Sequence, residues 1–499
     1  MINKNFILVC RPFQQFPSGL IFPQTEFLLA LFPKSLLPEK IEKSHDFFNR
    51  FLGFFHTKER HDFSQTPFAA WRFSLLNIFP RPYYYDYYIF YLFYLFLSVK
   101  RAKKEHKRKA GITNMKIIFN RQQISNEVAP LMCAVSGKST LSAIEGILID
   151  AAEDGTCTMT TFDLEKGMRI QVKAQVEEAG CYVLNAQKFS QTVRVMDGEE
   201  VTLTVSENLQ ACITSGRSSH KMSALAAEDY PAIPRLETED GFTISQAALK
   251  EMLSKTMYAM ASNDTRPVLN GCHFKVSNDS ILAVSCDSFK LAKCVVAAPI
   301  ENQNTDGSDI SFSFIIPTKT VNELFRLLKD DERESVRIYM SRKNIVFHLK
   351  DSVFFSRLIE GAYIEYDRII SKSHRIFAYA NREKLISALE RAALVTEEKV
   401  VGSVRAHVRL ELDGDLLKIS ANSMVGSIYD ELQVEHEGDN LVIAFNNRFL
   451  IDSLRACDAE TVKISLTSSL TSINIEPVME EETGEREELF MLLPVRMKE

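Results

Sequence analysis

The stretch IIFNRQQISNEVAPLMCAV, residues 117–135, returns in pattern as FTISQAALKEMLSKTMYAM at residues 242–260 and as IFAYANREKLISALERAALV at residues 376–395. In each copy a short apolar run predicts a strand, and an apolar pair four residues apart then predicts one face of a helix. The pairs are Ile124 with Val128, Leu249 with Leu253, and Leu385 with Leu389. Their spacing of 125 and 136 residues along the chain indicates three copies of one unit.

The second half of each unit repeats as well. Residues 182–196 (YVLNAQKFSQTVRVM), 314–328 (FIIPTKTVNELFRLL) and 443–457 (IAFNNRFLIDSLRAC) each predict a strand, a turn and a helix, and alternating apolar residues then predict further strands. The unit is therefore strand, helix and strands, used twice per domain. We expect an α+β fold of three similar domains, at residues 115–236, 237–373 and 374–499, after an atypical extension at residues 1–114.

The helices of the second halves share a pair of basic residues about two turns apart. The pairs are Lys188 with Arg194, Lys319 with Arg326, and Arg448 with Arg455. A basic helix face is often only a solvated surface. In a chain with a net charge of −6, however, a basic pair in every domain favours a surface that contacts polyanion phosphates without reading bases.

Residues 1–114 differ in composition from the rest of the chain. They carry 17 Lys and Arg against 8 Asp and Glu, a net of +9, which leaves −15 for residues 115–499. The uncharged aromatic run at residues 87–99 is shorter than the roughly 20 apolar residues of a spanning helix. It also lies too far along the chain for a secretory signal. We expect translation to start at Met115, and the competing interpretation is a weak interfacial anchor of a membrane-associated structural protein.

Patterns for catalysis and metal binding are weak. The nine cysteines never form C-x-x-C, so neither a disulfide framework nor a zinc site is predicted, and a reducing cytosol fits their use. The GKS at residues 137–139 ends like a P-loop, but Met132 occupies the place of the first glycine and a predicted helix precedes it. Asp163 with Glu165 suits acid-base chemistry, although such pairs are more often surface charges or loop caps. We predict no enzyme, no metal site and no cofactor.

Several stretches, in this order and spacing, resemble one family, the bacterial DNA polymerase III beta subunits or sliding clamps. They are SGRSSHKMSALAAEDYPAI (215–233), NDTRPVLNGCHF (263–274), CDSFKLAKC (286–294), RAALVTEEK (391–399), LKISANS (417–423) and LLPVRM (492–497). The resemblance spans residues 115–497, and none of its stretches is a catalytic signature. It implies the DNA clamp fold, a homodimeric six-domain ring around duplex DNA, a cytoplasmic location and a non-catalytic role as a processivity factor in DNA replication.

The resemblance also implies partners and contact residues. The partners are double-stranded DNA bound without regard to sequence, the DNA polymerase III alpha subunit, the clamp loader, other proteins with clamp-binding motifs, and a second copy of the chain. Lys138 and Asn263 match DNA-facing loop positions of the first and second domains. Leu394 and Val395 match apolar positions at the ring interface, opposite the first domain near His220, with helical core as the competing explanation.

A second functional surface implied by the resemblance is a pocket between the second and third domains that receives short peptides of partner proteins. Its apolar walls suit leucine and phenylalanine anchors, and its basic rim suits polar or acidic peptide ends. Ordinary interdomain core is the alternative for each apolar member. The matching residues are Arg266, Leu269, Cys286, Ser288, Lys290, Leu291, Ile364, Arg368, Ile369, Asn446, Phe449, Met491, Leu493, Pro494, Val495, Arg496 and Met497.

The chain departs from the family pattern at this pocket. Residues 286–291 read Cys-Asp-Ser-Phe-Lys-Leu where the family often reads Thr-Asp-Gly-His-Arg-Leu, and residues 363–366 read Tyr-Ile-Glu-Tyr in place of Phe-Pro-Asp-Tyr. Lys498 and Glu499 extend past the usual end of the family. We expect the pocket to keep its role with an altered peptide preference.

Overall fold

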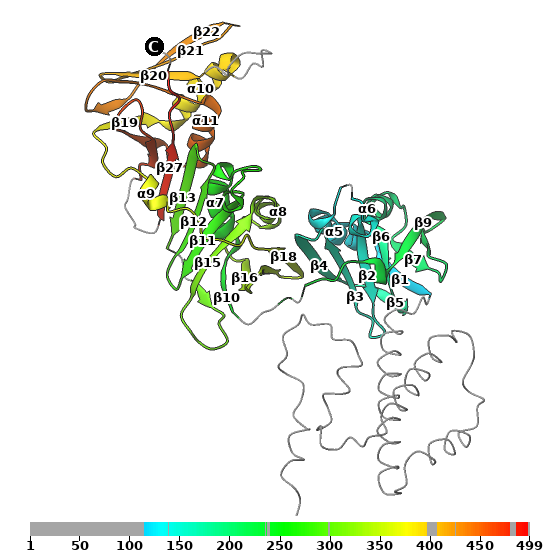
Figure 1. The fold of residues 1–499 in the computed structure, drawn as a ribbon. Helices are drawn as coiled ribbons and strands as arrows, with labels where there is room; N and C mark the ends of the chain where they lie inside the picture. Colours follow the sequence, from blue (N-terminus) through cyan, green and yellow to red (C-terminus); the bar gives the residue numbers. More distant parts are fainter. Residues whose placement is uncertain are drawn as a thin grey trace, which may run out of the picture. The chain divides into compact units, whose positions relative to one another are not determined.

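The computed structural model describes residues 114–499, apart from residues 138, 235, 237–239, 298–299, 397–406, 425, 480–485 and 498–499. The expectations for residues 1–113 and for Lys138 therefore lie outside the described residues. Within them, helices and antiparallel sheets build the expected α+β fold (Figure 1). No helix of this part of the chain is both long enough and apolar enough to cross a membrane.

A strand that runs directly into a helix recurs through the described residues, twice in each expected domain. In chain order the pairs are β1 (Met115–Asn120) with α5 (Arg121–Leu131), β6 (Gly180–Asn185) with α6 (Ala186–Val195), β10 (Gly241–Ser245) with α7 (Gln246–Thr256), β15 (Ser311–Pro317) with α8 (Thr318–Leu327), β19 (Ile376–Asn381) with α10 (Arg382–Thr396), and β24 (Leu441–Phe445) with α11 (Asn447–Ala456). The repeat predicted from the sequence is thus confirmed.

Local sequence explains where these helices begin and which face they bury. The side chains of Asn120, Asn185, Asn381 and Asn446 each accept a hydrogen bond from a backbone N–H of the first helical turn. The apolar pairs four residues apart that were predicted for the first helix of each domain are all at most 2% exposed. Burial of that face holds each helix against its sheet.

The remaining strands complete the sheets. In the first domain they are β2 (Gly146–Ala151), β3 (Cys157–Phe162), β4 (Lys166–Val172), β5 (Gln175–Glu178), β7 (Glu200–Val205), β8 (Gln210–Ser215) and β9 (Ser218–Ala226). In the second they are β11 (Gly271–Ser277), β12 (Ile281–Cys286), β13 (Lys290–Val296), β14 (Glu301–Asn302), β16 (Ser335–Met340), β17 (Asn344–Leu349) and β18 (Ser352–Arg357), with the short helix α9 (Tyr366–Ile369) after them. In the third they are β20 (Val408–Asp413), β21 (Leu416–Asn422), β22 (Ser427–Gln433), β23 (Glu435–Glu437), β25 (Thr461–Leu466), β26 (Ile473–Pro477) and β27 (Arg486–Leu492).

Two of the sheets run across domain boundaries. The first sheet has the order β14-β10-β16-β17-β18-β4-β3-β2-β6-β9-β8-β7-β1-β5, the second β15-β11-β12-β13-β27-β26-β25-β19-β23, and the third β22-β21-β20-β24. Strand β18 of the second domain pairs with β4 of the first, and β27 of the third domain pairs with β13 of the second. Neighbouring domains are therefore joined by main-chain hydrogen bonds as well as by a linker.

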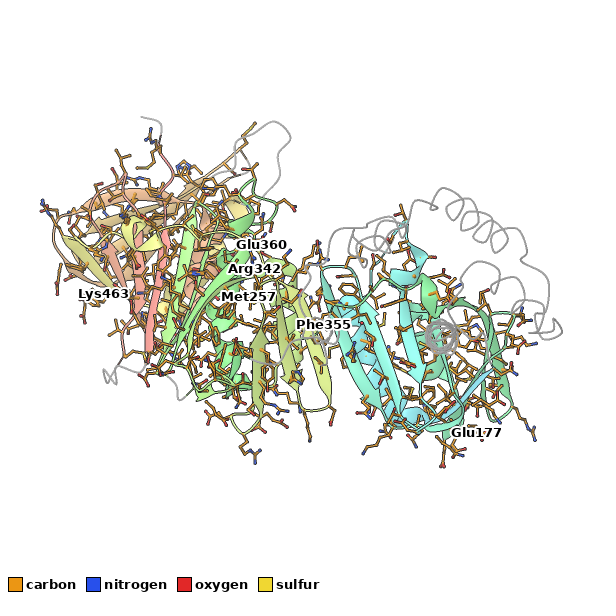
Figure 2. All side chains as sticks on the ribbon, turned by 60° about the horizontal axis from the view of Figure 1, so that its bottom comes forward. Glu177, Met257, Arg342, Phe355, Glu360 and Lys463 are labelled. Atoms are coloured by element: carbon orange, nitrogen blue, oxygen red, sulfur yellow. The ribbon has the colours of Figure 1, made fainter. Side chains whose placement is uncertain are left out.

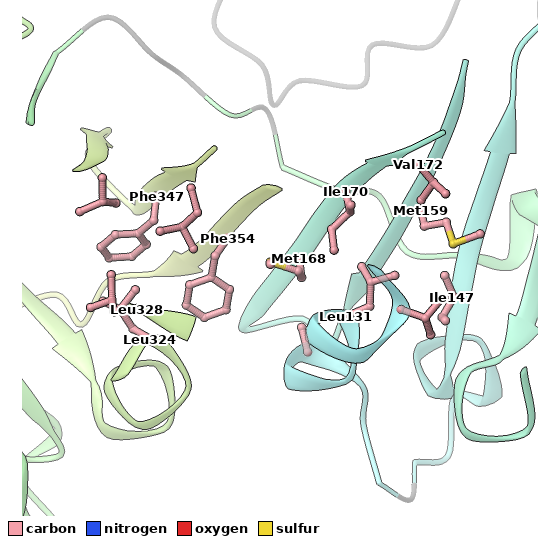
Figure 3. Packing of buried hydrophobic residues seen from close by; sticks show 14 of the residues in the cluster. Leu131, Ile147, Met159, Met168, Ile170, Val172, Leu324, Leu328, Phe347 and Phe354 are labelled. Carbon is pink, nitrogen blue, oxygen red and sulfur yellow. The ribbon is translucent and has the colours of Figure 1, made fainter. Parts of the chain in front are cut away.

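The junction of the first and second domains is closed by apolar packing. Phe354 on β18 lies opposite Met168 on β4, and Figure 3 shows these two side chains between the buried residues of both domains. The next residue, Phe355, labelled in Figure 2, fills the space beside Gly167, where an added Cβ would lie 2.1 Å from its ring. Phe355 also packs against Phe162, with ring centroids 5.8 Å apart.

The junction of the second and third domains is a longer ladder. It runs from Lys290 opposite Leu492 to Val296 opposite Arg486. A short 3-10 turn after α7, Met257–Ala259, adds a further contact to the third domain. Its Tyr258 donates a hydrogen bond of 3.1 Å to Ser453 on α11 and packs against Phe490 with ring centroids 6.3 Å apart. This junction positions the candidate pocket.

Candidate functional site

Helix α6 presents two basic side chains to solvent. Lys188 and Arg194 are exposed, while Ala186, Phe189 and Val193 on the other side of the helix are buried. The ion pairs found among the described residues involve neither Lys188 nor Arg194. Both charges are therefore available to an anion such as a phosphate.

The equivalent cations of α8 and α11 have acidic neighbours that the sequence pattern did not reveal. The closest nitrogen–oxygen distances are 3.0 Å for Lys319 with Glu165, 3.1 Å for Arg326 with Glu323, 3.9 Å for Arg448 with Asp452, and 2.6 Å for Arg455 with Glu390. Exposed pairs of this kind contribute about 0–1 kcal/mol each, so a phosphate can displace the carboxylate. The predicted basic residues are present in all three domains, and within the part of the chain that the structure describes only Lys188 and Arg194 have no carboxylate in ion-pair distance.

Of the two predicted loop contacts, only Asn263 lies in the described residues. It is exposed and has φ of 62°, a left-handed conformation that asparagine adopts more readily than most residues. Upstream of residues 137–139, α5 passes into a 3-10 turn at Met132–Ala134. The prediction that a helix precedes the GKS is confirmed, and this is not the strand that a P-loop requires.

The acidic pair at Asp163 and Glu165 has a structural explanation. Asp163 accepts hydrogen bonds from the backbone N–H groups of Glu165 and Lys166, at 3.0 and 2.8 Å, and from the Lys166 ammonium at 2.7 Å. Glu165 pairs with Lys319. These carboxylates therefore cap a turn and bind a neighbouring domain. Within the described ranges, no group of three His, Cys, Asp or Glu side chains is placed to hold a metal ion.

The floor of the candidate pocket is a small apolar cluster of both domains. Leu269, Cys286 and Leu291 of the second domain and Met491 of the third are at most 4% exposed, and Ile364 packs against them. Leu291 and Met491 lie opposite each other in the β13–β27 ladder. The pairing of these strands therefore places the predicted apolar residues side by side, and burial raises the pKa of the Cys286 thiol.

The rim of the candidate pocket is organised by hydrogen bonds at a tight turn. Lys290 forms an ion pair with Asp287, and its ammonium lies 4.4 Å from the centre of the Phe449 ring, so it links the two domains. Arg266 donates hydrogen bonds to Asp264 and to the Ser288 hydroxyl. Ser288 has φ of 80° at the position where the resemblance expects glycine, and a side chain in that conformation costs about 1–2 kcal/mol.

The C-terminal segment after β27 lies along the same rim. Leu493 donates its backbone N–H to the carbonyl of Phe289 at 2.9 Å, and Val495 donates to Ala444 at 2.8 Å. Besides Arg266 and Ser288, the predicted side chains of this rim that remain accessible are Arg368, Ile369, Leu493, Val495, Arg496 and Met497, with Pro494 half-buried and Asn446 capping α11. Arg368 is held by Glu365.

One apolar rim residue was missed by sequence reasoning. Phe289 is 60% exposed, and its ring centroid lies 6.3 Å from that of Phe449. The sequence feature that could have revealed its exposure is its position between Ser288 and Lys290 in a polar turn, where an aromatic side chain has no core to enter.

A separate hollow lies behind the pocket. It has a volume of about 730 Å³ and shares Ile364 and Arg368 with the pocket, but is otherwise lined by residues such as His273, Arg342 and Tyr363. His273 stacks on Tyr363 at 4.8 Å between centroids, and burial, aided by Lys275, lowers the pKa of its imidazole to about 4. Most of the residues predicted for the peptide pocket therefore lie outside this hollow.

The residues predicted for the dimer contact are largely exposed. Leu394 at the end of α10 is 77% exposed, and Val395 beside it is half-buried. Tyr429, on the terminal strand β22, is 59% exposed. In the first domain, His220 on β9 is exposed and its Nδ1 lies 2.6 Å from the Thr192 hydroxyl of α6. Sequence reasoning singled out Leu394 and His220 but not Tyr429, because a single tyrosine in an alternating strand does not show that the strand lies at a sheet edge.

Three family models match successive parts of the chain. They are described as the N-terminal, central and C-terminal domains of the DNA polymerase III beta subunit, and they cover residues 115–234, 243–365 and 367–488. The beta sliding clamps of Salmonella typhimurium and Escherichia coli are each 31% identical, over 386 and 387 residues, which is 77% of this chain and all of theirs. The crystal structure of the DNA polymerase sliding clamp from Bacillus subtilis is 26% identical with a TM-score of 0.70, again over 77% of this chain and all of that one.

Proposed function

The chain belongs to the DNA polymerase III beta subunit family, and from this we propose that two copies join head to tail in a ring around duplex DNA. The relatives are sliding clamps, and the protein is accordingly a non-catalytic processivity factor of DNA replication. Such a clamp raises the effective concentration of a polymerase at its template and carries out no chemistry of its own.

The ring is best supported by the pattern of sheet edges. Strands β4 and β13 each pair with the last strand of the following domain, β18 and β27, whereas the equivalent strand β22 ends its sheet. In the first domain the strand equivalent to β18 and β27 is β9, whose residues 218–221 are exposed. Pairing of β22 with β9 of a second copy would repeat the internal junctions, and two such contacts would close six domains into a ring.

DNA contact is proposed for the basic helix residues and the two loop positions. Lys188 and Arg194 would contribute most, because they are exposed and no ion pair found in the described residues engages them. Lys319, Arg326, Arg448 and Arg455 would exchange a carboxylate for a phosphate, and Asn263 and Lys138 would contact the backbone from loops. Such binding is independent of base sequence and weakens with salt.

The groove between the second and third domains would receive partner peptides. Leu291 and Met491 form its apolar floor, Arg266 is an exposed basic group of the rim, and the buried Lys290 supports the rim through Asp287 and Phe449. We propose the DNA polymerase III alpha subunit, the clamp loader and other proteins with clamp-binding motifs as partners, and the cytoplasm as the location. The exposed Phe289 in place of the family's histidine would favour apolar peptide residues.

Domain boundaries at residues 115–236, 237–373 and 374–499 accompany this proposal. The family models cover residues 115–234, 243–365 and 367–488, and the extension before Met115 lies outside those matches. Mass spectrometry of the native protein would test the expected start. Peptides from before residue 110 would contradict it.

The proposed ring is tested by the mass of the protein in solution. We expect light scattering to give two chains for the wild type and one chain when Leu394→Glu and Val395→Glu are combined, because charges would enter the proposed interface. Leu470→Glu, at a site that is 69% exposed in a turn of the third domain, is the matched control and should leave two chains. A double variant with the wild-type mass would contradict the proposed interface.

A further inference from the structure

Five charged side chains form a cluster that joins the second and third domains beside the β13–β27 ladder. Lys255, in the last turn of α7, is 1% exposed, and its ammonium pairs with Asp458 and, at 3.6 Å, with Glu488. Arg486 donates two hydrogen bonds of 2.5 and 2.6 Å to Glu251 and lies 3.8 Å from Glu488. Lys255 and Glu251 belong to the second domain and the other three to the third, so the cluster crosses the junction.

This charged cluster is poorly explained as a source of stability. Desolvation of buried charges offsets much of their attraction, and apolar side chains of similar volume often serve stability equally well. Glu488 is 6% exposed, and burial raises the pKa of its carboxyl although Lys255 and Arg486 lower it. Its Oε2 atom has no hydrogen-bond partner among the described residues. A better-attested role of buried charged groups is to hold two structural elements in one relative arrangement.

The junction of the first and second domains lacks the charged cluster at the equivalent positions. The Asp163–Lys166 and Asp287–Lys290 turns make the same hydrogen bonds, and they set a common register for the two ladders. In this register Glu488, opposite Cys294, corresponds to Ser352, opposite Ile170. When the repeated helices are aligned, Pro130 of the first domain corresponds to Lys255 of the second. In the same way, Lys329 of the second domain corresponds to Asp458 of the third. The cluster is therefore particular to the second junction and is not part of the repeated fold.

The second junction is also the one that forms the peptide groove. From the Glu488 position, the ladder reaches Met491 opposite Leu291, on the floor of the groove, after three residues, a distance of about 10 Å. Asp458 follows the end of α11, the helix that carries Phe449 to the rim. The charged cluster thus holds both third-domain walls of the groove, β27 and α11, to one side chain of the second domain.

We propose that Lys255 is a positioning residue for the peptide groove. Its ion pairs with Asp458 and Glu488 fix β27 and α11 against the second domain at the spacing that a bound peptide needs. The proposal rests on the proposed peptide-binding function of the groove.

The test separates positioning from stability by comparing single and double substitutions in the full chain. The readouts are anisotropy of a fluorescein-labelled peptide with leucine and phenylalanine anchors, and the urea midpoint. We expect Lys255→Met to weaken peptide binding about tenfold and to lower the midpoint. Lys255→Met with Glu488→Met should restore the midpoint, since no unpaired buried charge remains, yet leave binding weak. Lys255→Arg should keep most of the affinity.

Glu165→Gln is the matched control, because it removes the ion pair of the first junction with Lys319 and should change neither readout. The proposal would be overturned if the double variant regained both midpoint and affinity, or if Lys255→Met bound the peptide as the wild type does. A wild type that binds no peptide would refute the function of the groove instead.

If the wild type binds no peptide, hydrogen exchange can still test whether Lys255 positions β27 and α11, because it needs no ligand. We expect faster exchange of the β13 and β27 amides in the double variant, with the β4 and β18 amides unchanged. Equal exchange in wild type and double variant along β13 and β27 would overturn the proposal.

Discussion

The β4–β18 ladder and the β13–β27 ladder start from the same Asp–Lys turn and then differ in what surrounds them. Around the first ladder, the tilted rings of Phe162 and Phe355 pack against each other, and the exposed ion pair of Lys319 with Glu165 crosses between domains. Around the second, a charged cluster crosses instead, in which Lys255 and Glu488 are buried and Asp458, Arg486 and Glu251 are more exposed. The same repeated backbone unit is thus surrounded by apolar packing at one junction and by a charged cluster at the other.

The largest effects are expected from the aromatic residues at matching places in the two ladders. Phe354 and Phe490 are both fully buried, so Phe354→Ala and Phe490→Ala should each lower the free energy of unfolding by about 3–5 kcal/mol. Only Phe490→Ala should also weaken peptide binding, because its neighbour Met491 lies on the groove floor. Urea titration measures the free energy of unfolding, and fluorescence anisotropy measures peptide binding. If both variants lost peptide affinity equally, the two junctions would not differ in their role in peptide binding.

The two Asp–Lys turns allow a smaller and closely matched comparison. Lys166→Met and Lys290→Met each remove a largely buried hydrogen bond to a carboxylate, which we expect to cost about 1.5–3 kcal/mol. Lys290→Met should in addition weaken peptide binding, since the Lys290 ammonium contacts the Phe449 ring at the rim. A Lys166→Met variant that bound the peptide more weakly than wild type would show that the groove is not confined to the second junction.

Acid should weaken the second domain through His273. Its imidazole has a pKa of about 4 in the folded chain, against about 6.5 when unfolded. The neutral ring therefore contributes stability that is fully present above pH 6.5 and is lost as the pH falls towards 4, by about 1–2 kcal/mol after allowance for solvent screening. Urea midpoints between pH 7 and 4 should fall less steeply in His273→Gln.

A second histidine also contributes to the fall of the urea midpoint with falling pH. The pKa of His348 on β17 is also lowered by burial, with Arg337 adding to the effect, so the His273→Gln variant should retain some acid sensitivity. An unchanged slope in His273→Gln would mean that His273 is not the main titrating group in this range.

The smallest effect is expected at the exposed pair of the first junction. Glu165→Gln should change the free energy of unfolding by less than about 0.5 kcal/mol, because both side chains are more than half exposed. It should tighten DNA binding slightly at low salt, since Lys319 loses its competing carboxylate. Filter binding at two salt concentrations measures this, and weaker DNA binding would argue against a phosphate contact by Lys319.

Sequence periodicity predicted the repeated unit because its causes are local. Apolar pairs such as Leu249 with Leu253, and capping residues such as Asn185, act within one or two helical turns. The groove residues came from the family resemblance, and the register of β13 with β27 then places Leu291 beside Met491. The family and its non-catalytic function were predicted, and both are confirmed by the matches to sliding clamps.

Long-range contacts were beyond sequence reasoning. Lys255 and Asp458 lie 203 residues apart, and Lys319 and Glu165 lie 154 residues apart, so no periodic pattern links them. Glu390, the partner of Arg455, was missed for the same reason. Glu323 and Asp452 are local, three and four residues from Arg326 and Arg448 on the same helices, and helical spacing could have found them. Open strand edges such as β22 depend on the complete strand order, which alternation along one strand does not specify.

Retention on DNA tests the central claim most directly. The protein would be loaded onto nicked circular DNA by a clamp loader, washed at high salt, and assayed again after the circle is cut. The account predicts a two-chain species that stays on the circle at high salt and slips off linear DNA, because its link to DNA is topological. Release by salt from the intact circle, or retention on linear DNA, would contradict it.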